Sequence, residues 1–239
     1  RLDVSPEVWP DFWRQFKTMM RKVNPDSLMV AECWDDSREW LTVGDMFDST
    51  MHYVLSRNIW SRFCRHEIST AQFDCALNRA AMLYPQRTQE VLWTFLGSHD
   101  TQRIRTRAGG DLRMVHAASF FQFTYLGSPI IYYGDELGME GENDPDCRRA
   151  MDWEAAERES ELLGWFRELI ALRKGSQPSG KAAFTTPSAT TAPTCSAFAA
   201  LTRGRTCWSS STRGSAGTRA RPACRTAPAS GARSSPARQ

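Results

Sequence analysis

The sequence predicts an α/β fold in which parallel strands alternate with helices and close into a βα barrel. The first observation is the alternation itself, because segments with helical periodicity are separated by short apolar runs of strand length. The second is that chemically capable residues directly follow these runs, namely Glu32, His99, Asp100, Asp135 and Glu136. In a βα barrel every strand points its carboxyl end at one shared site. A doubly wound sheet is the alternative, but no G-x-G-x-x-G motif supports nucleotide binding.

The first predicted helix covers residues 8–23, where apolar side chains recur at steps of four and three. These side chains are Val8, Phe12, Phe16, Met19 and Val23. Residues 24–26, Asn-Pro-Asp, end this helix. The apolar run 28–31 is the first predicted strand, and the region 51–84 is predicted to be helical with loops.

The second half of the ordered chain repeats this pattern. Residues 91–96 form the second predicted strand, and residues 111–125 form a helix that is apolar almost all round, which predicts burial. The Gly-Ser-Pro segment 127–129 breaks that helix, and 130–133 is the third predicted strand. One more amphipathic helix, within 162–173, closes the ordered part.

The composition is that of a globular protein, with 41% hydrophobic and 24% charged residues among 239. No uncharged apolar window long enough to cross a membrane exists, so we expect no membrane partner. Charge is divided unevenly near Gly175. Residues 176–239 hold no Asp or Glu and nine Lys or Arg, so they carry +9 against a net −6 for the rest.

The segment 176–239 is of low complexity, because 46 of its 64 residues are Ala, Ser, Thr, Pro or Gly. Such a segment buries too little apolar surface to offset its ordering entropy, so we expect disorder. Its abrupt onset also suggests a reading-frame error, which resequencing the gene would test. Without interleaved aromatics or a recognisable binding module, it does not predict nucleic-acid binding. The expected domains are therefore 1–175 and this tail.

The cysteines predict free thiols rather than disulfides or a zinc site. The chain has seven cysteines, an odd number, and no C-x-x-C pair. Free thiols are typical of a reducing compartment, which favours the cytoplasm. The acidic pair Asp135 and Glu136 could suggest a metal site, but we favour a structural role in the loop after the last strand.

Two carboxylates that face one point are the minimum equipment for glycoside hydrolysis. Asp3 and Glu32 are the candidates at the start of the chain. Arg1 stands two residues before Asp3, so in an extended segment both side chains share one face. The guanidinium can then keep the carboxylate ionised and oriented. One carboxylate must be ionised to attack and the other protonated to act as an acid.

Four segments, in order, resemble motifs of glycoside hydrolase family 13, the α-amylase family. Residues 1–4 resemble its nucleophile motif, and 30–34 its acid/base strand. Residues 95–101 resemble its transition-state-stabiliser motif, and 127–139 its last barrel strand. With its continuation through 143–149, that last segment is similar to the neopullulanase, cyclomaltodextrinase and maltogenic amylase branch.

This resemblance implies a role for each matching residue. Asp3 resembles the nucleophile, Glu32 the general acid and base, and Asp100 the third carboxylate, which binds sugar hydroxyls. Three further residues resemble substrate-binding positions: Arg1 orients Asp3, His99 binds a hydroxyl, and Trp34 flanks the leaving-group subsite.

The resemblance covers residues 1–175 and implies the C-terminal part of a (β/α)8 TIM barrel. This part runs from the end of strand 4 to strand 8 and its helix. Strands one to three, the domain inserted after strand three and the β-sandwich expected near Ser176 are absent from the sequence, so we expect a fragment. The Asp35-Asp36 pair stands where many relatives have a His.

The implied function is that of a retaining α-glycosidase that hydrolyses or transfers α-1,4 glucosidic bonds, with α-1,6 bonds as second candidates, in maltodextrins, cyclodextrins, pullulan or starch. No cofactor is expected, although calcium is possible in the full-length protein. A homodimer is expected only for that longer protein. Two alternatives are a non-catalytic barrel of the transporter-ancillary type and a truncated product without activity of its own.

Overall fold

The computed structural model describes residues 1–158 and 160–175, which all belong to one compact unit. The predicted disordered tail, 176–239, lies outside the described residues, so its disorder and the domain boundary stay predictions. None of the helices in the described part of the chain has the length and apolar character needed to cross a membrane.

Every strand pairing in the described residues is parallel. The strands are β1 (Val30–Ala31), β2 (Ser49–Thr50), β3 (Trp93–Phe95) and β4 (Ser128–Ile130). β1 pairs with β2, and β3 pairs with β4. Isolated bridges from Leu2 to β1 and from Met51 to β3 join these pairs into one series.

The strands therefore follow one another in chain order, beginning at Leu2 and ending at β4. A doubly wound sheet reverses its order at a switch point, whereas a βα barrel adds each strand beside the preceding one. The observed order is that of the barrel. It also brings the carboxyl ends of all strands to the same edge.

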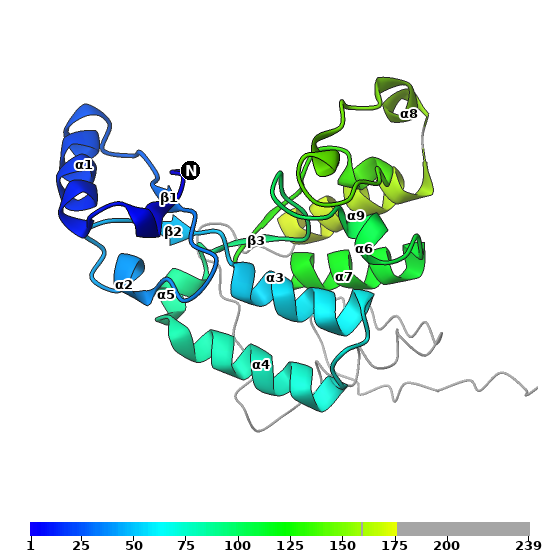
Figure 1. The fold of residues 1–239 in the computed structure, drawn as a ribbon, viewed down its shortest axis with the longest axis horizontal. Coiled ribbons are helices and arrows are strands. Elements are labelled where there is room, and N and C mark those ends of the chain that lie inside the picture. Colours follow the sequence, from blue (N-terminus) through cyan, green and yellow to red (C-terminus); the bar gives the residue numbers. More distant parts are fainter. Residues whose placement is uncertain (159, 176–239) are drawn as a thin grey trace, which may run out of the picture. The chain divides into compact units, whose positions relative to one another are not determined.

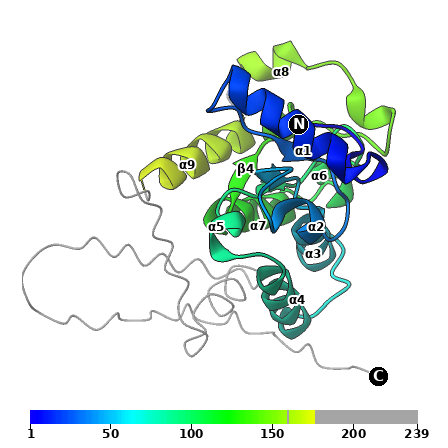
Figure 2. The same ribbon diagram turned by 90° about the vertical axis from the view of Figure 1, so that its left-hand side faces the viewer.

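Helices fill the connections between strands, as Figure 1 shows. The α-helices are α1 (Pro10–Val23), α2 (Arg38–Leu41), α3 (Tyr53–Ile59), α4 (Thr70–Leu83), α5 (Gln86–Gln89), α6 (Ile104–Arg107), α7 (Leu112–Thr124), α8 (Trp153–Glu157) and α9 (Glu161–Gly175). A π-helical turn, η2 (Trp60–Cys64), extends α3, and three 3₁₀ turns are η1 (Ser5–Glu7), η3 (Asp135–Leu137) and η4 (Asp146–Arg148). Both ribbon views place α3 beside α4 and α7 beside α9 (Figures 1 and 2).

Local signals explain where the long helices begin and end. α1 starts at Pro10, whose missing N–H costs nothing in the first turn, and ends before the Asn-Pro pair at 24–25. α4 begins with a capping box, in which Ser69 and Gln72 satisfy each other's backbone N–H groups. Asp111 caps α7 by accepting a hydrogen bond from the Arg113 N–H.

Two apolar clusters hold these elements together. The larger packs α3, α4, α7 and α9 around β3, with Phe63, Phe73 and Phe121 in mutual ring contact. The smaller packs α1 and α2 against β1, with Trp13 edge-on to Phe47. α7 is largely buried, as we predicted from the apolar residues on almost all of its sides. The predicted helices at 8–23, 111–125 and 162–173 are therefore confirmed.

The third strand lies earlier than predicted, at Ser128–Ile130 instead of 130–133. The Gly-Ser-Pro segment had indicated a break before the strand. The Ser128 N–H donates to the Leu92 carbonyl, 2.7 Å away. In a parallel ladder the N–H groups of neighbouring residues point to opposite sides of the strand. Since the Ser128 N–H points toward β3, the Pro129 nitrogen points away from β3, and its missing hydrogen costs no bond to that strand. β2 and α2 were not predicted, because both are too short to show a period.

Candidate active site

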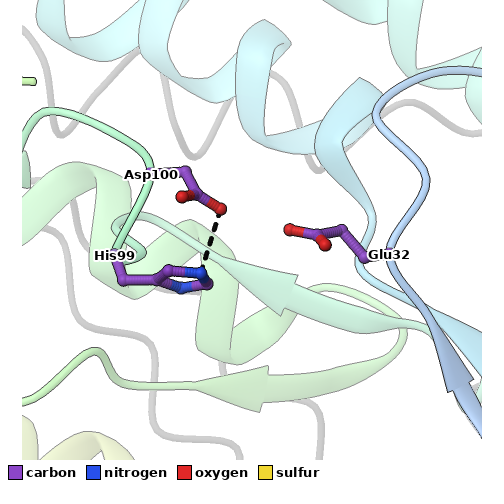
Figure 3. Close-up of side chains that lie close together, drawn as sticks. All are labelled: Glu32, His99 and Asp100. Carbon is purple, nitrogen blue, oxygen red and sulfur yellow. Dashed lines mark ion pairs between the residues drawn. The ribbon is translucent and has the colours of Figure 1, made fainter. Parts of the chain in front are cut away.

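The candidate site lies where the carboxyl ends of the strands meet. Asp3 follows the Leu2 bridge, Glu32 follows β1, and the turn with His99 and Asp100 follows β3. Figure 3 shows Glu32, His99 and Asp100 pointing toward a common point. One side-chain atom from each of these three residues lies within 4.8 Å of those from the other two. The fold thus brings together residues that are 68 positions apart in the chain.

Arg1 connects the first two carboxylates. Its Nη1 donates to Asp3 Oδ1 and to Glu32 Oε2, the latter at 2.6 Å. Because both oxygens contact the same nitrogen, they lie within about 5 Å of each other. The predicted pairing of Arg1 with Asp3 is therefore present, and the same guanidinium also reaches Glu32.

Glu32 is buried, and backbone groups hold it in place. Its own N–H lies 3.1 Å from the Leu2 carbonyl and 3.1 Å from the Ser5 hydroxyl oxygen. The Val4 N–H donates to Glu32 Oε2 at 3.2 Å. Val4 has φ 42°, a left-handed conformation that is rare for a β-branched residue, and it adopts this strained backbone next to the carboxylate. Sequence reasoning missed Ser5, whose contacts cross 27 residues.

The pKa values of the two carboxyl groups shift in opposite directions. Burial, followed by a hydrogen bond with Asp3, raises the pKa of Glu32. The hydrogen bond with Glu32, followed by that from Arg1, lowers the pKa of Asp3. The favoured arrangement thus has the proton on Glu32 and the negative charge on Asp3.

Two side chains, those of His99 and Arg148, lie beside the third carboxylate, which is that of Asp100. Asp100 Oδ2 lies 3.1 Å from His99 Nε2, and Asp100 Oδ1 accepts from Arg148 Nη2 at 3.1 Å. His99 Nε2 also lies 3.1 Å from Arg1 Nη2. One ring nitrogen cannot both donate to Asp100 and accept from Arg1, so the tautomer of His99 decides which of these two contacts is a hydrogen bond. Arg148 lies within the segment that identified the branch, but its contact with Asp100 was not predicted.

Trp34 forms an aromatic platform beside these residues. Its ring stacks on Tyr53 with centroids 4.3 Å apart, and 44% of the residue is exposed. Burial, with smaller contributions from the charges of Glu32 and Asp100, raises the pKa of Tyr53 to about 12. Arg57 holds the platform by donating to the Trp34 carbonyl. Tyr53 was missed because nothing in the helical region 51–84 distinguished it from core residues.

Glu32, His99 and Asp100 are also the one group of three in residues 1–158 and 160–175 with potential metal-binding geometry. The Arg1 guanidinium contacts both Glu32 and His99 and already supplies positive charge there. The donor set therefore suits proton transfer better than metal binding. Asp135 instead forms a buried ion pair with Arg103, which agrees with a structural role.

Comparison with known proteins gives consistent matches. A sequence profile described as "Alpha amylase, catalytic domain" matches residues 5–179. Neopullulanase 2 of Thermoactinomyces vulgaris is 48% identical over 173 residues, which are 72% of this chain and 29% of that protein. A cyclomaltodextrinase of Bacillus sp is 41% identical over 175 residues, which are 73% of this chain and 31% of that protein.

Solved structures agree in fold. A cyclomaltodextrinase superposes with a TM-score of 0.71 at 38% identity, covering 73% of this chain and 30% of that one. The cyclic alpha-maltosyl-(1→6)-maltose hydrolase of Arthrobacter globiformis gives a TM-score of 0.71 at 35% identity, covering 74% and 40%. These structures are TIM-barrel enzymes. The chain spans about 30% of the length of the curated relatives it matches. The profile match over most of the chain shows that it belongs to the α-amylase catalytic-domain family.

Proposed function

We propose that the protein is a retaining α-glycosidase that hydrolyses or transfers α-1,4 glucosidic bonds, with α-1,6 bonds as second candidates. Its substrates would be maltodextrins, cyclodextrins, pullulan or starch. The observation that carries this proposal is the Asp3–Glu32 pair, whose proton is favoured on Glu32. Oxygens of the two carboxyl groups lie within about 5 Å of each other, which favours a retaining mechanism, because an inverting enzyme needs room for a water between its carboxyl groups.

In the first step, an ionised Asp3 oxygen attacks the anomeric carbon while the glycosidic C–O bond breaks. Glu32 gives its proton to the departing oxygen, and a covalent glycosyl ester forms on Asp3. Arg1 contributes by keeping the Asp3 carboxylate ionised and oriented before the attack. The burial of Glu32 contributes by retaining the proton until the leaving group needs it.

In the second step, the Glu32 carboxylate takes a proton from water or from an acceptor sugar hydroxyl. The resulting oxygen attacks the anomeric carbon, the ester bond to Asp3 breaks, and both groups return to their starting states. Asp100 and His99 would bind sugar hydroxyls as positive charge develops on the ring. Trp34 would receive the leaving-group sugar on its exposed face.

We further propose that residues 1–175 contribute the end of barrel strand 4 to strand 8 and its helix. The order of the motifs in the sequence and the chain order of the strands, from the Leu2 bridge to β4, support this placement. The four described cysteines are free, and one relative is named intracellular maltogenic amylase, so we propose a reducing compartment. We propose no cofactor, nucleic-acid or membrane partner.

The 239-residue chain alone is proposed to be inactive, because the position of Asp3 is weakly fixed. The Asp3 side chain is 72% exposed, and in the described residues its ion pair is with Arg1. A nucleophile needs closer positioning than one exposed pair provides. Hydrolysis by the purified 239-residue chain that is lost on Glu32→Gln would contradict this proposal. A non-catalytic barrel is less favoured, because Asp3, Glu32 and Asp100 are all retained.

The deciding experiment measures reducing sugar released from β-cyclodextrin, pullulan and soluble starch by the protein expressed from its complete open reading frame. Glu32→Gln should lower kcat by about 10³-fold, because the amide has no acid proton to give. Glu67→Gln, at an exposed pair with Arg65, is the matched control and should keep normal turnover. Near-normal turnover in Glu32→Gln, or no activity in the parent on all three glucans, would reject the proposed function.

A further inference from the structure

A buried ion pair lies beneath the turn that carries His99 and Asp100. Arg103 Nη1 is 3.2 Å from Asp135 Oδ1, and the two side chains are 0% and 4% exposed. Arg103 follows the turn after β3, whereas Asp135 begins the η3 turn after β4. The pair therefore ties together the loops after two neighbouring strands.

The Arg103 guanidinium is enclosed by backbone oxygens and aromatic rings. Nη1 also donates to the Tyr133 carbonyl at 2.6 Å, and Nε donates to the Cys147 carbonyl at 3.0 Å. The guanidinium carbon of Arg103 lies 4.5 Å from the ring centroid of Tyr132 and 4.7 Å from that of Tyr133. Nη2 is buried with no hydrogen-bond partner in the described part of the chain. Loss of Asp135 would leave this buried charge without its ion-pair partner.

Two contacts connect this pair to the turn itself. The Asp135 carboxylate lies against Gly97, where an added Cβ would come within 2.5 Å of Asp135 Oδ2. On the other side, Cys147 accepts from Arg103 through its carbonyl and donates through its thiol to the His99 carbonyl, 3.0 Å away. Asp135 thus packs against the start of the turn, and the His99 carbonyl is bound by the Cys147 thiol and by Arg148 Nε.

We propose that Arg103 and Asp135 are positioning residues, which hold the turn with His99 and Asp100 at the place where it faces Glu32. The catalytic consequence rests on the proposed function. Neither side chain is placed to touch substrate, and both act through the backbone of the turn. A displacement of about 1 Å at the reacting groups can lower a rate by up to about 100-fold.

The test variant is Asp135→Asn in the protein expressed from its complete open reading frame. Asp48→Asn is the matched control, because Asp48 pairs with Lys17 near the opposite end of β1 and does not contact the turn. The first readout is alkylation of Cys147 by iodoacetamide, followed by mass spectrometry. Cys147 is fully buried, Cys33 is a second buried thiol, and Cys75 is exposed and reports reagent activity.

If the pair positions the turn, Cys147 alkylation accelerates about tenfold or more in Asp135→Asn, while Cys33 stays protected. Equal protection of Cys147 in the variant and the parent overturns the proposal. Acceleration of both buried thiols together also overturns it, because that result means general loosening. This readout does not require activity, so it stands even if the parent hydrolyses no glucan.

The second readout is kcat and KM on the best glucan. Asp135→Asn should lower kcat about tenfold with little change in KM, and should add little to the loss caused by Asp100→Asn. If the two substitutions lower kcat by independent factors that multiply in the double variant, Asp135 does not act through Asp100. If Asp135→Asn fails to fold, Gly97→Ala tests the same contact with both charges retained. It should also accelerate Cys147 alkylation, and protected Cys147 in that variant rejects the proposal.

Discussion

The two halves of the candidate site hold their carboxylates in different ways. In the first half, the Asp3 side chain is 72% exposed, and among the described residues its ion pair is with Arg1. In the second half, the Asp100 side chain is 25% exposed, and its turn is tied down by Cys147 and the buried Arg103–Asp135 pair. The first half is positioned mainly by one exposed ion pair, and the second by buried contacts beneath its turn.

This difference has physical consequences. An exposed ion pair is screened by water and leaves the side chain mobile, whereas a turn fixed by buried contacts moves only if those contacts break. Glu32 shares a feature with each half. It contacts Arg1, as Asp3 does in the first half, and it is buried, like the contacts that support the second half. We therefore expect the first half to respond most to changes of charge, and the second to changes of packing.

Among the variants that test this comparison of the two halves, the largest expected effect comes from Arg1→Ala. It should lower kcat/KM at neutral pH by about 100-fold, because one preorganised cation serves both carboxylates. The hydrogen bond from Arg1 helps to lower the pKa of Asp3, so its loss raises that pKa. Activity needs ionised Asp3, and the acidic limb of the pH profile should therefore move to higher pH.

Arg1→Lys sharpens this prediction, because it keeps the charge but loses the fork, in which Nη1 contacts both carboxylates and Nη2 contacts His99. A smaller loss of kcat/KM is expected than for alanine. Arg14→Ala, at an exposed pair with Asp11 and Asp45, is the control and should leave the pH profile in place. An unchanged acidic limb in Arg1→Ala would show that packing also positions Asp3.

A smaller effect is expected from Arg148→Gln, in the second half. Arg148 contacts Asp100 Oδ1 but is 44% exposed, and the turn has buried supports besides it. We expect kcat/KM to fall about fivefold, since exposed pairs contribute at most about 1 kcal/mol. Arg149→Gln removes the neighbouring arginine, which pairs with Asp146, and should be silent. A 100-fold loss in Arg148→Gln would mean that charge dominates this half too.

The smallest effect at neutral pH is expected from His52, which lies between the halves. The backbone N–H of His52 donates to the Trp93 carbonyl, and the backbone N–H of Met51 donates to the Ala31 carbonyl. Burial lowers the pKa of His52 from 6.5 to about 4, so the folded state holds it neutral. The unfolded chain binds the proton first, and stability present above pH 6.5 is lost as the pH falls toward 4.

The full loss is roughly 3 kcal/mol in the free energy of unfolding. Urea unfolding at pH 7 and pH 4 measures it. His52→Gln should show a flatter pH dependence than the parent, whereas His66→Asn, at an exposed site, should match the parent. The same slope in all three proteins would rule out His52 as the acid-sensitive group between the halves.

Sequence patterns predicted the long helices because their periods extend over many residues, as in 8–23 and 111–125. They predicted Asp3, Glu32, His99 and Asp100 as site residues because each follows a strand within a recognisable motif. They misplaced the last strand, because Pro129 signals a break unless the side of the ladder it faces is known. β2 gave no local signal, although it joins the two halves of the sheet.

By itself, the sequence determined the family resemblance, the alternation of helices and strands, and the residue types that follow each strand. These properties are local, since periodicity, caps and motifs need only neighbours along the chain. Only the tertiary structure decided that Arg1 reaches Glu32, that Arg148 reaches Asp100, and that Arg103 pairs with Asp135. These contacts cross about 30 to 50 positions, and the opposite pKa shifts of Asp3 and Glu32 depend on the same convergence. Burial and charge proximity act through space, so a linear pattern cannot encode them locally.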